Sequence, residues 1–181
     1  MGRMASPESG FLPLRIAILV VSDTRTLETD TSGALLEEGF RRAGHEVVER
    51  RIVPDDVEAI RAWVTETAER ARVLVVTGGT GVTRRDVTPE AVETLFEKPL
   101  PGFGELFRWL SYEEIGSATI QSRATAGVLP GARLLFALPG SRNACRLALD
   151  RILLPQLDAR TRPCSFAGLL ERMERDEGEP N

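Results

Sequence analysis

The chain between residues 73 and 89 reads VLVVTGGTGVTRRDVTP. Its first residues, Val73 to Val76, form an uninterrupted apolar run, which is typical of a strand covered on both faces of a sheet. A glycine-rich segment follows directly, and Thr88 and Pro89 then suit the cap and the first position of a helix. This order of buried strand, glycine-rich loop and helix predicts an α/β domain with a parallel sheet.

The flanking sequence alternates in the same way. The apolar run from Ile16 to Val21 predicts another fully covered strand. Leu35, Leu36 and Phe40 then recur on one side of an expected helix. We therefore expect a three-layer α/β/α fold with a mostly parallel sheet. Strands are predicted at 15–22, 45–53, 73–76 and 134–138, and helices at 31–44, from 54, from 88, and at 103–115, 119–126 and 141–154.

The length and the terminal sequences predict a single domain with two appendages. A chain of 181 residues is still short enough for one hydrophobic core. We assign this domain to residues 14–165. Residues 1–13 show no periodicity and predict a flexible N-terminal arm, whereas an extended segment after Leu157 and a charged C-terminal tail at 166–181 are expected at the other end.

Charge and apolar pattern exclude several classes of protein. With a formal net charge of −4 and a pI near 5.2, the chain lacks the basic surface with which proteins bind nucleic acids. Its longest apolar stretch is far shorter than the roughly 20 residues that span a bilayer, so we expect a cytoplasmic protein without a membrane partner. Two cysteines and one histidine provide neither a disulfide framework nor a zinc site of usual spacing.

The glycine-rich segment has the composition of an anion-binding loop. Small residues let backbone N–H groups approach phosphate oxygens closely, and here they occupy Thr77, Gly78, Gly79, Thr80 and Gly81. The segment is no P-loop, because no Gly-Lys-Ser/Thr follows, and it lacks the third glycine of the dinucleotide fingerprint. Glycine also suits a tight connection between a strand and a helix, so a purely structural role is the alternative.

Two further polar segments are expected at the same edge of the sheet. Ser22 and Asp23 follow the first strand, and Gly140 and Ser141 follow the last predicted strand. Ligands of open parallel sheets bind beyond the carboxyl ends of the strands. We therefore expect the glycine-rich segment and these two turns to converge on one ligand site.

Charged residues after the glycines indicate what the loop binds. Arg84 and Arg85 could neutralise phosphate charge, and Asp86 supplies the hard oxygen ligand that Mg²⁺ prefers. Asp55, at the end of the second strand, offers another carboxylate. The two carboxylates could instead act as general acid and base, but phosphoryl transfer depends more on positioning and charge neutralisation. For Asp55, capping of the following helix is an equal alternative.

A set of motifs spread from Arg15 to Cys164 matches one known family. They are Arg15-Ile16-Ala17-Ile18-Leu19, Asp30-Thr31-Ser32-Gly33, Thr77 to Gly81, Gly102-Phe103-Gly104-Glu105, Ser111 to Ile115, Gln121-Ser122-Arg123-Ala124, Leu138-Pro139-Gly140-Ser141, Ala144-Cys145-Arg146 and Gln156 to Cys164. In this combination the chain resembles the molybdenum cofactor biosynthesis protein B (MoaB) family. Its relatives include the molybdopterin adenylyltransferase MogA and a domain of gephyrin, and the segments 103–121 and 157–164 favour MoaB over MogA.

The resemblance implies the molybdenum cofactor biosynthesis protein fold, a reaction and a set of site residues. In that reaction the terminal phosphate of molybdopterin attacks the α-phosphate of MgATP, which releases pyrophosphate and leaves adenylylated molybdopterin. The family pattern makes Asp55 and Asp86 the catalytic carboxylates and the ligands of Mg²⁺. It assigns nucleotide binding to Ser22, Asp23, Thr77, Gly78, Gly79, Thr80, Gly81, Gly140 and Ser141, and molybdopterin binding to Ser122, Arg123 and Arg85.

Retention of Asp55 and Asp86, which some family members have lost, favours an active adenylyltransferase. A protein that only binds molybdopterin is the main alternative, and a CinA-like nucleotide pyrophosphatase is a less favoured one. The resemblance also implies a homotrimer or a homohexamer. Large apolar side chains on one predicted helix, if they are exposed, would provide the contact between subunits: Phe103, Phe107 and Trp109.

Overall fold

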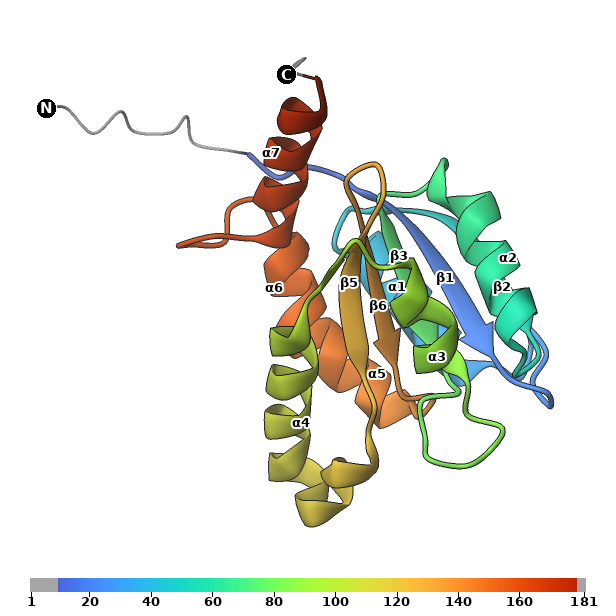
Figure 1. Cartoon of the computed structure of the whole chain (residues 1–181). Helices are drawn as coiled ribbons and strands as arrows, with labels where there is room; N and C mark the ends of the chain where they lie inside the picture. The colour runs from blue at the N-terminus through green and yellow to red at the C-terminus, as the bar shows by residue number, and fades with distance from the viewer. Residues whose placement is uncertain (1–9, 179–181) are drawn as a thin grey trace, which may run out of the picture.

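A computed structural model describes residues 10–178, and its centre is a six-stranded sheet (Figure 1). The strand order across the sheet is β2-β1-β3-β6-β5-β4. The strands span Arg15–Val21 (β1), Glu46–Val53 (β2), Val73–Thr77 (β3), Lys98–Pro99 (β4), Thr125–Leu129 (β5) and Arg133–Leu138 (β6). β1 pairs in parallel with β2 and β3, and β3 with β6, whereas β5 runs antiparallel to β6 and to β4. This mostly parallel sheet confirms the predicted fold class.

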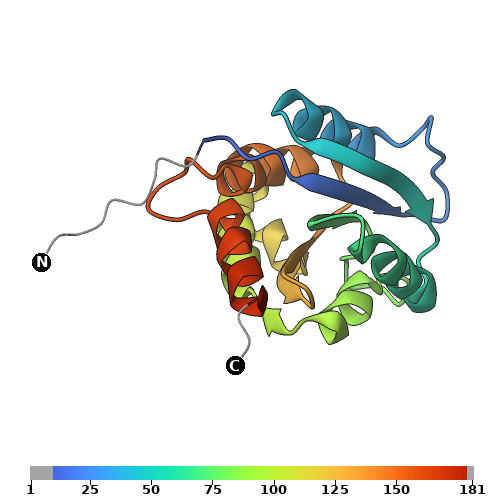
Figure 2. The ribbon, with the colours of Figure 1, turned by 90° about the horizontal axis from the view of Figure 1, so that it is seen from above.

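Helices cover both faces of the sheet (Figure 2). α1, α4 and α5 pack on one face, and α2 and α3 pack on the other. The helices span Thr31–Arg42 (α1), Val57–Ala68 (α2), Thr88–Val92 (α3), Pro101–Ile115 (α4), Arg142–Ala148 (α5), Leu154–Leu157 (α6) and Phe166–Gly178 (α7), with 3₁₀ turns at Glu93–Leu95 (η1) and Gly116–Gln121 (η2) and a π-helical segment at Leu149–Leu153 (η3). Within residues 10–178, no helix combines the length and the apolar character needed to cross a membrane.

The unbroken apolar runs of the central strands supply two separate cores. Ile16 and Ile18 of β1 are fully buried against the face that α1 covers, whereas Ala17 and Leu19 are fully buried against the face that α2 covers. Successive side chains of a strand point to opposite faces of the sheet. A strand covered on both faces therefore has no polar position, which is the pattern that predicted it.

The prediction of a helix at residues 119–126 was wrong. The chain forms the 3₁₀ helix η2 there and then enters β5, which pairs with β6 from Thr125 opposite Ala137 to Leu129 opposite Arg133. Gly127 lies so close to Phe96 that an added Cβ would be 2.2 Å from the ring. Both contacts are made with residues outside the segment itself, and such tertiary contacts override local propensity. The two-residue strand β4 was not predicted either.

The C-terminal segment also differs from its prediction. The expected charged tail is helix α7, whose Ala167 and Leu170 are buried, and Leu170 belongs to the core on the α1 side of the sheet. Because many residues after 170 are charged, the sequence pattern did not indicate the apolar side of this amphipathic helix. Residues 1–9 of the predicted arm and 179–181 of the tail lie outside the described residues. Phe11, within the predicted arm, packs on His45 with ring centroids 5.1 Å apart.

Candidate functional site

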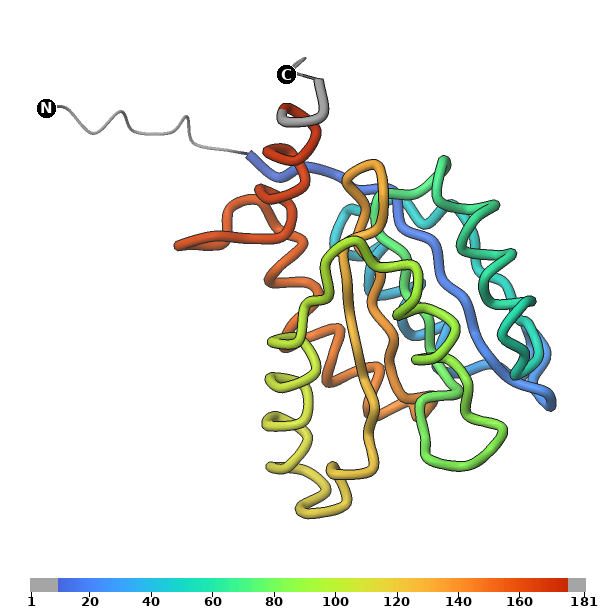
Figure 3. Tube along the Cα trace, viewed as in Figure 1, coloured from blue at the N-terminus to red at the C-terminus, as the bar shows by residue number. Residues whose placement is uncertain are grey.

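The carboxyl ends of β1, β3 and β6 lie at one edge of the sheet, where the loops that follow them gather (Figure 3). Hydrogen bonds fix the start of the glycine loop after β3. The Gly78 N–H donates to the Leu138 carbonyl at 3.0 Å. Thr88 donates from its N–H to the Gly79 carbonyl at 2.9 Å and from its hydroxyl to the Gly78 carbonyl at 2.8 Å. The loop is thereby closed onto the helix that follows it.

Two positions of the loop require glycine. Gly78 has a φ of +103°, and a Cβ there would lie 2.2 Å from the Val21 carbonyl oxygen. Gly79 has a φ of +64°, and a Cβ there would lie 2.4 Å from the Thr88 hydroxyl oxygen. Side chains disfavour these dihedral angles and neither position has room for one. Tight packing of the loop against β1 and α3 therefore depends on both glycines.

The two threonines of the segment 77–81 are buried. Thr77 is fully buried, and its hydroxyl donates to the Pro139 carbonyl at 3.0 Å, which ties β3 to the turn after β6. Thr80 is 3% exposed, and its carbonyl accepts the Arg123 N–H at 3.2 Å. Both residues were predicted to bind nucleotide. The Thr77 side chain has no exposed surface that could contact a ligand. Its hydrogen bond to the Pro139 carbonyl instead supports the turn that carries Gly140 and Ser141.

Asp86 closes the outer part of the loop. Its Oδ2 accepts hydrogen bonds from the Thr83 N–H at 2.9 Å and the Thr83 hydroxyl at 2.6 Å. The bond from the Thr83 hydroxyl is the largest of the effects that lower the pKa of Asp86 below its usual value. A Cβ on Gly81 would lie 2.8 Å from Asp86 Oδ2. An ionised carboxylate therefore lies directly against the glycine loop.

Asp55 reaches the same loop from the end of β2. A Cβ on Gly79 would lie 2.9 Å from Asp55 Oδ1. Among the described residues, none donates a hydrogen bond to this carboxylate. Partial burial, followed by repulsion from Asp23 and Asp86, raises the pKa of Asp55 above its usual value. The site thus gathers negative charge at the position where the loop is expected to bind phosphate.

The neighbours of Asp55 have structural partners. Asp56 caps α2, because its Oδ1 accepts the Ala59 N–H at 2.8 Å. Asp23 accepts the Asp55 N–H at 3.2 Å and forms an ion pair with Arg85. The hydrogen bond from the Asp55 N–H is the first cause of a lowered pKa for Asp23. The cap of α2 is therefore Asp56, and capping does not account for Asp55.

Asp55→Asn is expected to raise thermal stability. The raised pKa means that the folded protein disfavours the ionised form, so at pH 7 this charge destabilises the fold and a neutral amide removes the repulsion. We expect a Tm higher than that of the wild type by about 1–3 °C in calorimetry at pH 7. Asp23→Asn is the matched comparison and is expected to lower the Tm, because the fold stabilises that charge. A lower Tm for Asp55→Asn contradicts this account.

The Arg123 side chain donates hydrogen bonds to two backbone carbonyls of the loop. Its Nε donates to the Gly81 carbonyl at 2.7 Å, one Nη donates to the Asp86 carbonyl at 2.8 Å, and the other pairs with Glu90. A guanidinium presents its donors in a rigid planar fork, which suits several acceptors at once. The sequence predicted Arg123 as a molybdopterin ligand. In the structure, its side chain joins the glycine loop to α3.

A cavity of about 320 Å³ opens beside the loop and contains most of the predicted site. It is lined by Gly78, Gly79, Thr80, Gly81, Asp86, Ser122, Gly140 and Ser141. Its opposite wall comes from α4 and α5 and was missed by the sequence analysis: Phe107, Ser111, Glu114, Ile115, Asn143 and Leu147. Ser111 and Glu114 are three residues apart on a helix, so a helical projection of this segment could have indicated a shared face.

Ser22 and Asp23 lie in a different cavity, of about 500 Å³. Arg25, Arg50 and Arg51 are among its other lining residues. Apart from the buried Thr77, the predicted nucleotide-binding residues therefore line two cavities, and the structure does not bring the β1 turn into the cavity beside the glycine loop. The hydrogen bond from the Asp55 N–H to Asp23 joins the two regions. The exposed Arg85 adds an ion pair to Asp23 at this junction.

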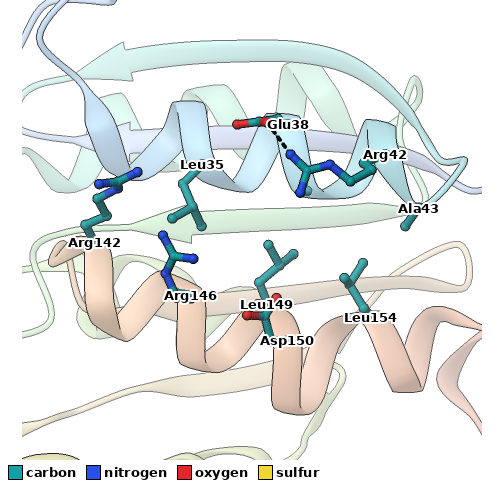
Figure 4. Close-up of a pocket in the computed structure, with 10 residues that line it drawn as sticks. Leu35, Glu38, Arg42, Ala43, Arg142, Arg146, Leu149, Asp150 and Leu154 are labelled. Carbon is teal, nitrogen blue, oxygen red and sulfur yellow. Dashed lines mark hydrogen bonds and ion pairs between the residues drawn. The ribbon is translucent and has the colours of Figure 1, made fainter.

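A further cavity, of about 430 Å³, lies between α1 and α5, with α5 on the lower side of the close-up (Figure 4). Arg142 and Arg146 line it together with Asp150, and Arg42 lines it while paired with Glu38. No residue predicted for the site belongs to it. Its mixed charges do not select one class of ligand.

Comparisons with known proteins find relatives over most of the chain. A family model described as "Probable molybdopterin binding domain" matches residues 17–159. Molybdenum cofactor biosynthesis protein B of Escherichia coli (strain K12) is 51% identical over 165 residues, which cover 90% of this chain and 96% of that protein. A crystal structure of molybdenum cofactor biosynthesis protein B has a TM-score of 0.82 at 43% identity and covers 91% of this chain and 98% of that one. The structure of the tungsten cofactor synthesizing protein MoaB from Pyrococcus furiosus has a TM-score of 0.71 at 41% identity, over 77% and 90% of the two chains.

Proposed function

The chain belongs to the molybdenum cofactor biosynthesis protein B family, and from this membership we propose that it catalyses the Mg²⁺-dependent adenylylation of molybdopterin. In the proposed reaction the terminal phosphate of molybdopterin displaces pyrophosphate from ATP at the α-phosphorus. One P–O bond forms and one breaks, so the reaction needs no oxidant and no covalent enzyme intermediate. ATP and molybdopterin are the substrates.

The observation that carries this proposal is the approach of two carboxylates to one glycine loop. Asp55 follows the end of β2, and Asp86 lies in the loop after β3. A Cβ on Gly79 would lie 2.9 Å from Asp55 Oδ1, and a Cβ on Gly81 would lie 2.8 Å from Asp86 Oδ2. A loop rich in glycine lets backbone N–H groups reach phosphate oxygens, but carboxylates beside it would repel a nucleotide. A divalent cation between carboxylates and phosphates resolves this conflict.

The residues present fit Mg²⁺. No group of three or more His, Cys, Asp or Glu side chains within residues 10–178 is arranged to hold a metal without help. Mg²⁺ in phosphate-transfer sites is usually held by one or two carboxylates together with substrate phosphates. Asp55 has no hydrogen-bond donor at its carboxylate and suffers repulsion from Asp86, as expected of a cation ligand. When bound, Mg²⁺ would neutralise charge on the phosphates.

Two cavities lie near Asp86 and Asp55. Asp86 lines the cavity of about 320 Å³ beside the glycine loop, and Asp23, which is bonded to the Asp55 N–H, lines the neighbouring cavity of about 500 Å³. Asp55 lies between these two regions, because its N–H donates to Asp23 and its carboxylate lies beside Gly79. We assign Gly140 and Ser141 to the nucleotide and Ser122 to molybdopterin; all three line the first cavity, where we propose that the reacting groups of both substrates meet.

Pyrophosphate release tests the proposed function. The purified protein with Mg²⁺, ATP and molybdopterin should release pyrophosphate, and omission of molybdopterin should abolish the release. Release from ATP without molybdopterin would assign the chain to the nucleotide pyrophosphatases instead. Tight molybdopterin binding without any pyrophosphate would make it a binding protein. Either result contradicts the proposed adenylyltransferase activity.

We also propose that the protein is a homotrimer or a homohexamer. Phe103 and Phe107, which were predicted as contact residues, belong to the core, but Trp109 is 65% exposed. Other exposed apolar side chains follow it on α4 and η2: Tyr112, Ile115 and Ile120. An apolar surface of this kind is typical of a protein contact.

Trp109→Glu is expected to lower the molar mass measured by light scattering, because a buried contact would then contain an unpaired charge. The wild type should have the mass of a trimer or a hexamer. Leu27→Glu changes another exposed apolar side chain away from α4 and serves as the control. If the wild type is a monomer, the proposed oligomer is wrong. If Trp109→Glu has the same mass as an oligomeric wild type, the exposed surface of α4 and η2 is not the contact between subunits.

A further inference from the structure

The segment from Gly81 to Asp86 is held from two sides. On its inner side, the Asp86 carboxylate accepts two hydrogen bonds from Thr83, as described above. On its outer side, the carbonyls of the two end residues accept hydrogen bonds from Arg123 at 2.7 Å and 2.8 Å. Between these ends the chain is exposed, and Val82 has 67% of its surface accessible. The Asp86 carboxylate also bonds to the Gly81 backbone, so Arg123 adds a second link between the two ends of the segment.

The position of Arg123 is itself fixed. Its N–H donates to the Thr80 carbonyl at 3.2 Å, which anchors its backbone to the same loop. Its guanidinium forms an ion pair with Glu90 on α3, and this pair lowers the pKa of Glu90. Because the guanidinium is planar, the ion pair on one Nη orients the other two donors toward the loop carbonyls. Arg123 is only 32% exposed, so its contacts are partly shielded from water.

We propose that Arg123 and Glu90 form a clamp that sets the conformation of residues 81–86 and thereby aims the Asp86 carboxylate at the cavity beside the glycine loop. Arg123 is then a positioning residue that acts through the loop, rather than a ligand of the pterin. The geometric part, that the clamp holds residues 81–86, follows from these contacts alone. The catalytic part, that it positions Asp86 for the reaction, rests on the proposed function.

Limited proteolysis tests the geometric part without any substrate. Arg84 and Arg85 lie in the clamped segment, and trypsin cleaves after arginine only when the local backbone can open. We expect Arg123→Gln and Glu90→Ala each to accelerate cleavage after Arg84 and Arg85 by about tenfold or more, because charge-assisted hydrogen bonds to the loop are lost. Circular dichroism checks that both variants are folded.

Arg42→Gln is the matched control for proteolysis. It breaks the exposed ion pair between Arg42 and Glu38 on α1, far from the loop, and should leave the cleavage rate unchanged. Equal cleavage rates in the wild type, Arg123→Gln and Glu90→Ala overturn the clamp. If the wild type released no pyrophosphate, the proposed function would fail, while the cleavage rates would still decide the conformational role.

Steady-state kinetics tests the catalytic part. A clamp predicts that both variants lower kcat and raise the Mg²⁺ concentration needed for half-maximal rate, with the KM for molybdopterin unchanged. Glu90→Gln keeps an oxygen acceptor for Arg123 and should recover part of the kcat lost in Glu90→Ala. A raised KM for molybdopterin in Arg123→Gln, with Glu90→Ala like the wild type, makes Arg123 a pterin ligand and overturns the proposal.

Discussion

Asp86→Asn is expected to reduce molybdopterin-dependent pyrophosphate release by about 100-fold or more, as for the loss of one well-placed charge-stabilising group in an active site. Asparagine keeps an oxygen that accepts the hydrogen bonds from Thr83, so the loop should keep its conformation. It loses the negative charge that the proposed site uses to hold Mg²⁺. The measurement is kcat at saturating ATP and molybdopterin over a range of Mg²⁺ concentrations, with the Tm as a check of folding.

Asp56→Asn provides the matched control for this change. Asp56 is adjacent to Asp55 in the chain but caps α2, and asparagine is as good a cap as aspartate. Its kcat should stay close to that of the wild type. Wild-type turnover by Asp86→Asn would remove this carboxylate from the mechanism and contradict the assignment of the site.

Gly78→Ala is expected to have the largest effect on stability. The φ of +103° is unfavourable for alanine, and its Cβ would lie 2.2 Å from the Val21 carbonyl oxygen, which belongs to the backbone of β1. Strain and forced movement together should cost on the order of 3 kcal/mol. For a chain of this length, that corresponds to a fall in Tm of about 6–12 °C, measured by calorimetry.

Gly102→Ala is the control for this prediction. Gly102 lies in the first turn of α4, and an added Cβ there would meet nothing within 4 Å. Alanine is a better helix former than glycine by up to about 1 kcal/mol, so this variant should be at least as stable as the wild type. A Tm for Gly78→Ala equal to that of Gly102→Ala would contradict the packing described for the glycine loop.

The parallel half of the fold was predictable because its strands are buried on both faces. An apolar run such as Val73 to Val76 has no polar position that would fit a surface strand or an amphipathic helix. The antiparallel edge was not predictable in this way. β5 contains Thr125 and Gly127, and its conformation depends on β6 and on the Phe96 ring, which no local pattern reveals.

The sequence predicted local features of the candidate site where backbone geometry requires a residue type, but it did not predict how the fold brings distant segments together. The glycines at 78 and 79 are needed for their dihedral angles and close contacts, so composition alone indicated the loop. The wall formed by Ser111 and Glu114 depends on how α4 packs beside β5; their helical spacing indicates a shared face but not which segment that face meets. The separation of Ser22 from the cavity that holds Ser141 likewise depends on the shape of the loops.

Transfer of isotopic label from ATP to molybdopterin tests the central claim most directly. ATP labelled at the α-phosphorus should pass its label to molybdopterin in the presence of Mg²⁺, with one pyrophosphate released for each label transferred. ATP labelled at the γ-phosphorus should leave its label in pyrophosphate only. Label from the γ-position on molybdopterin, or pyrophosphate formed while the pterin stays unlabelled, would contradict adenylyl transfer at this site.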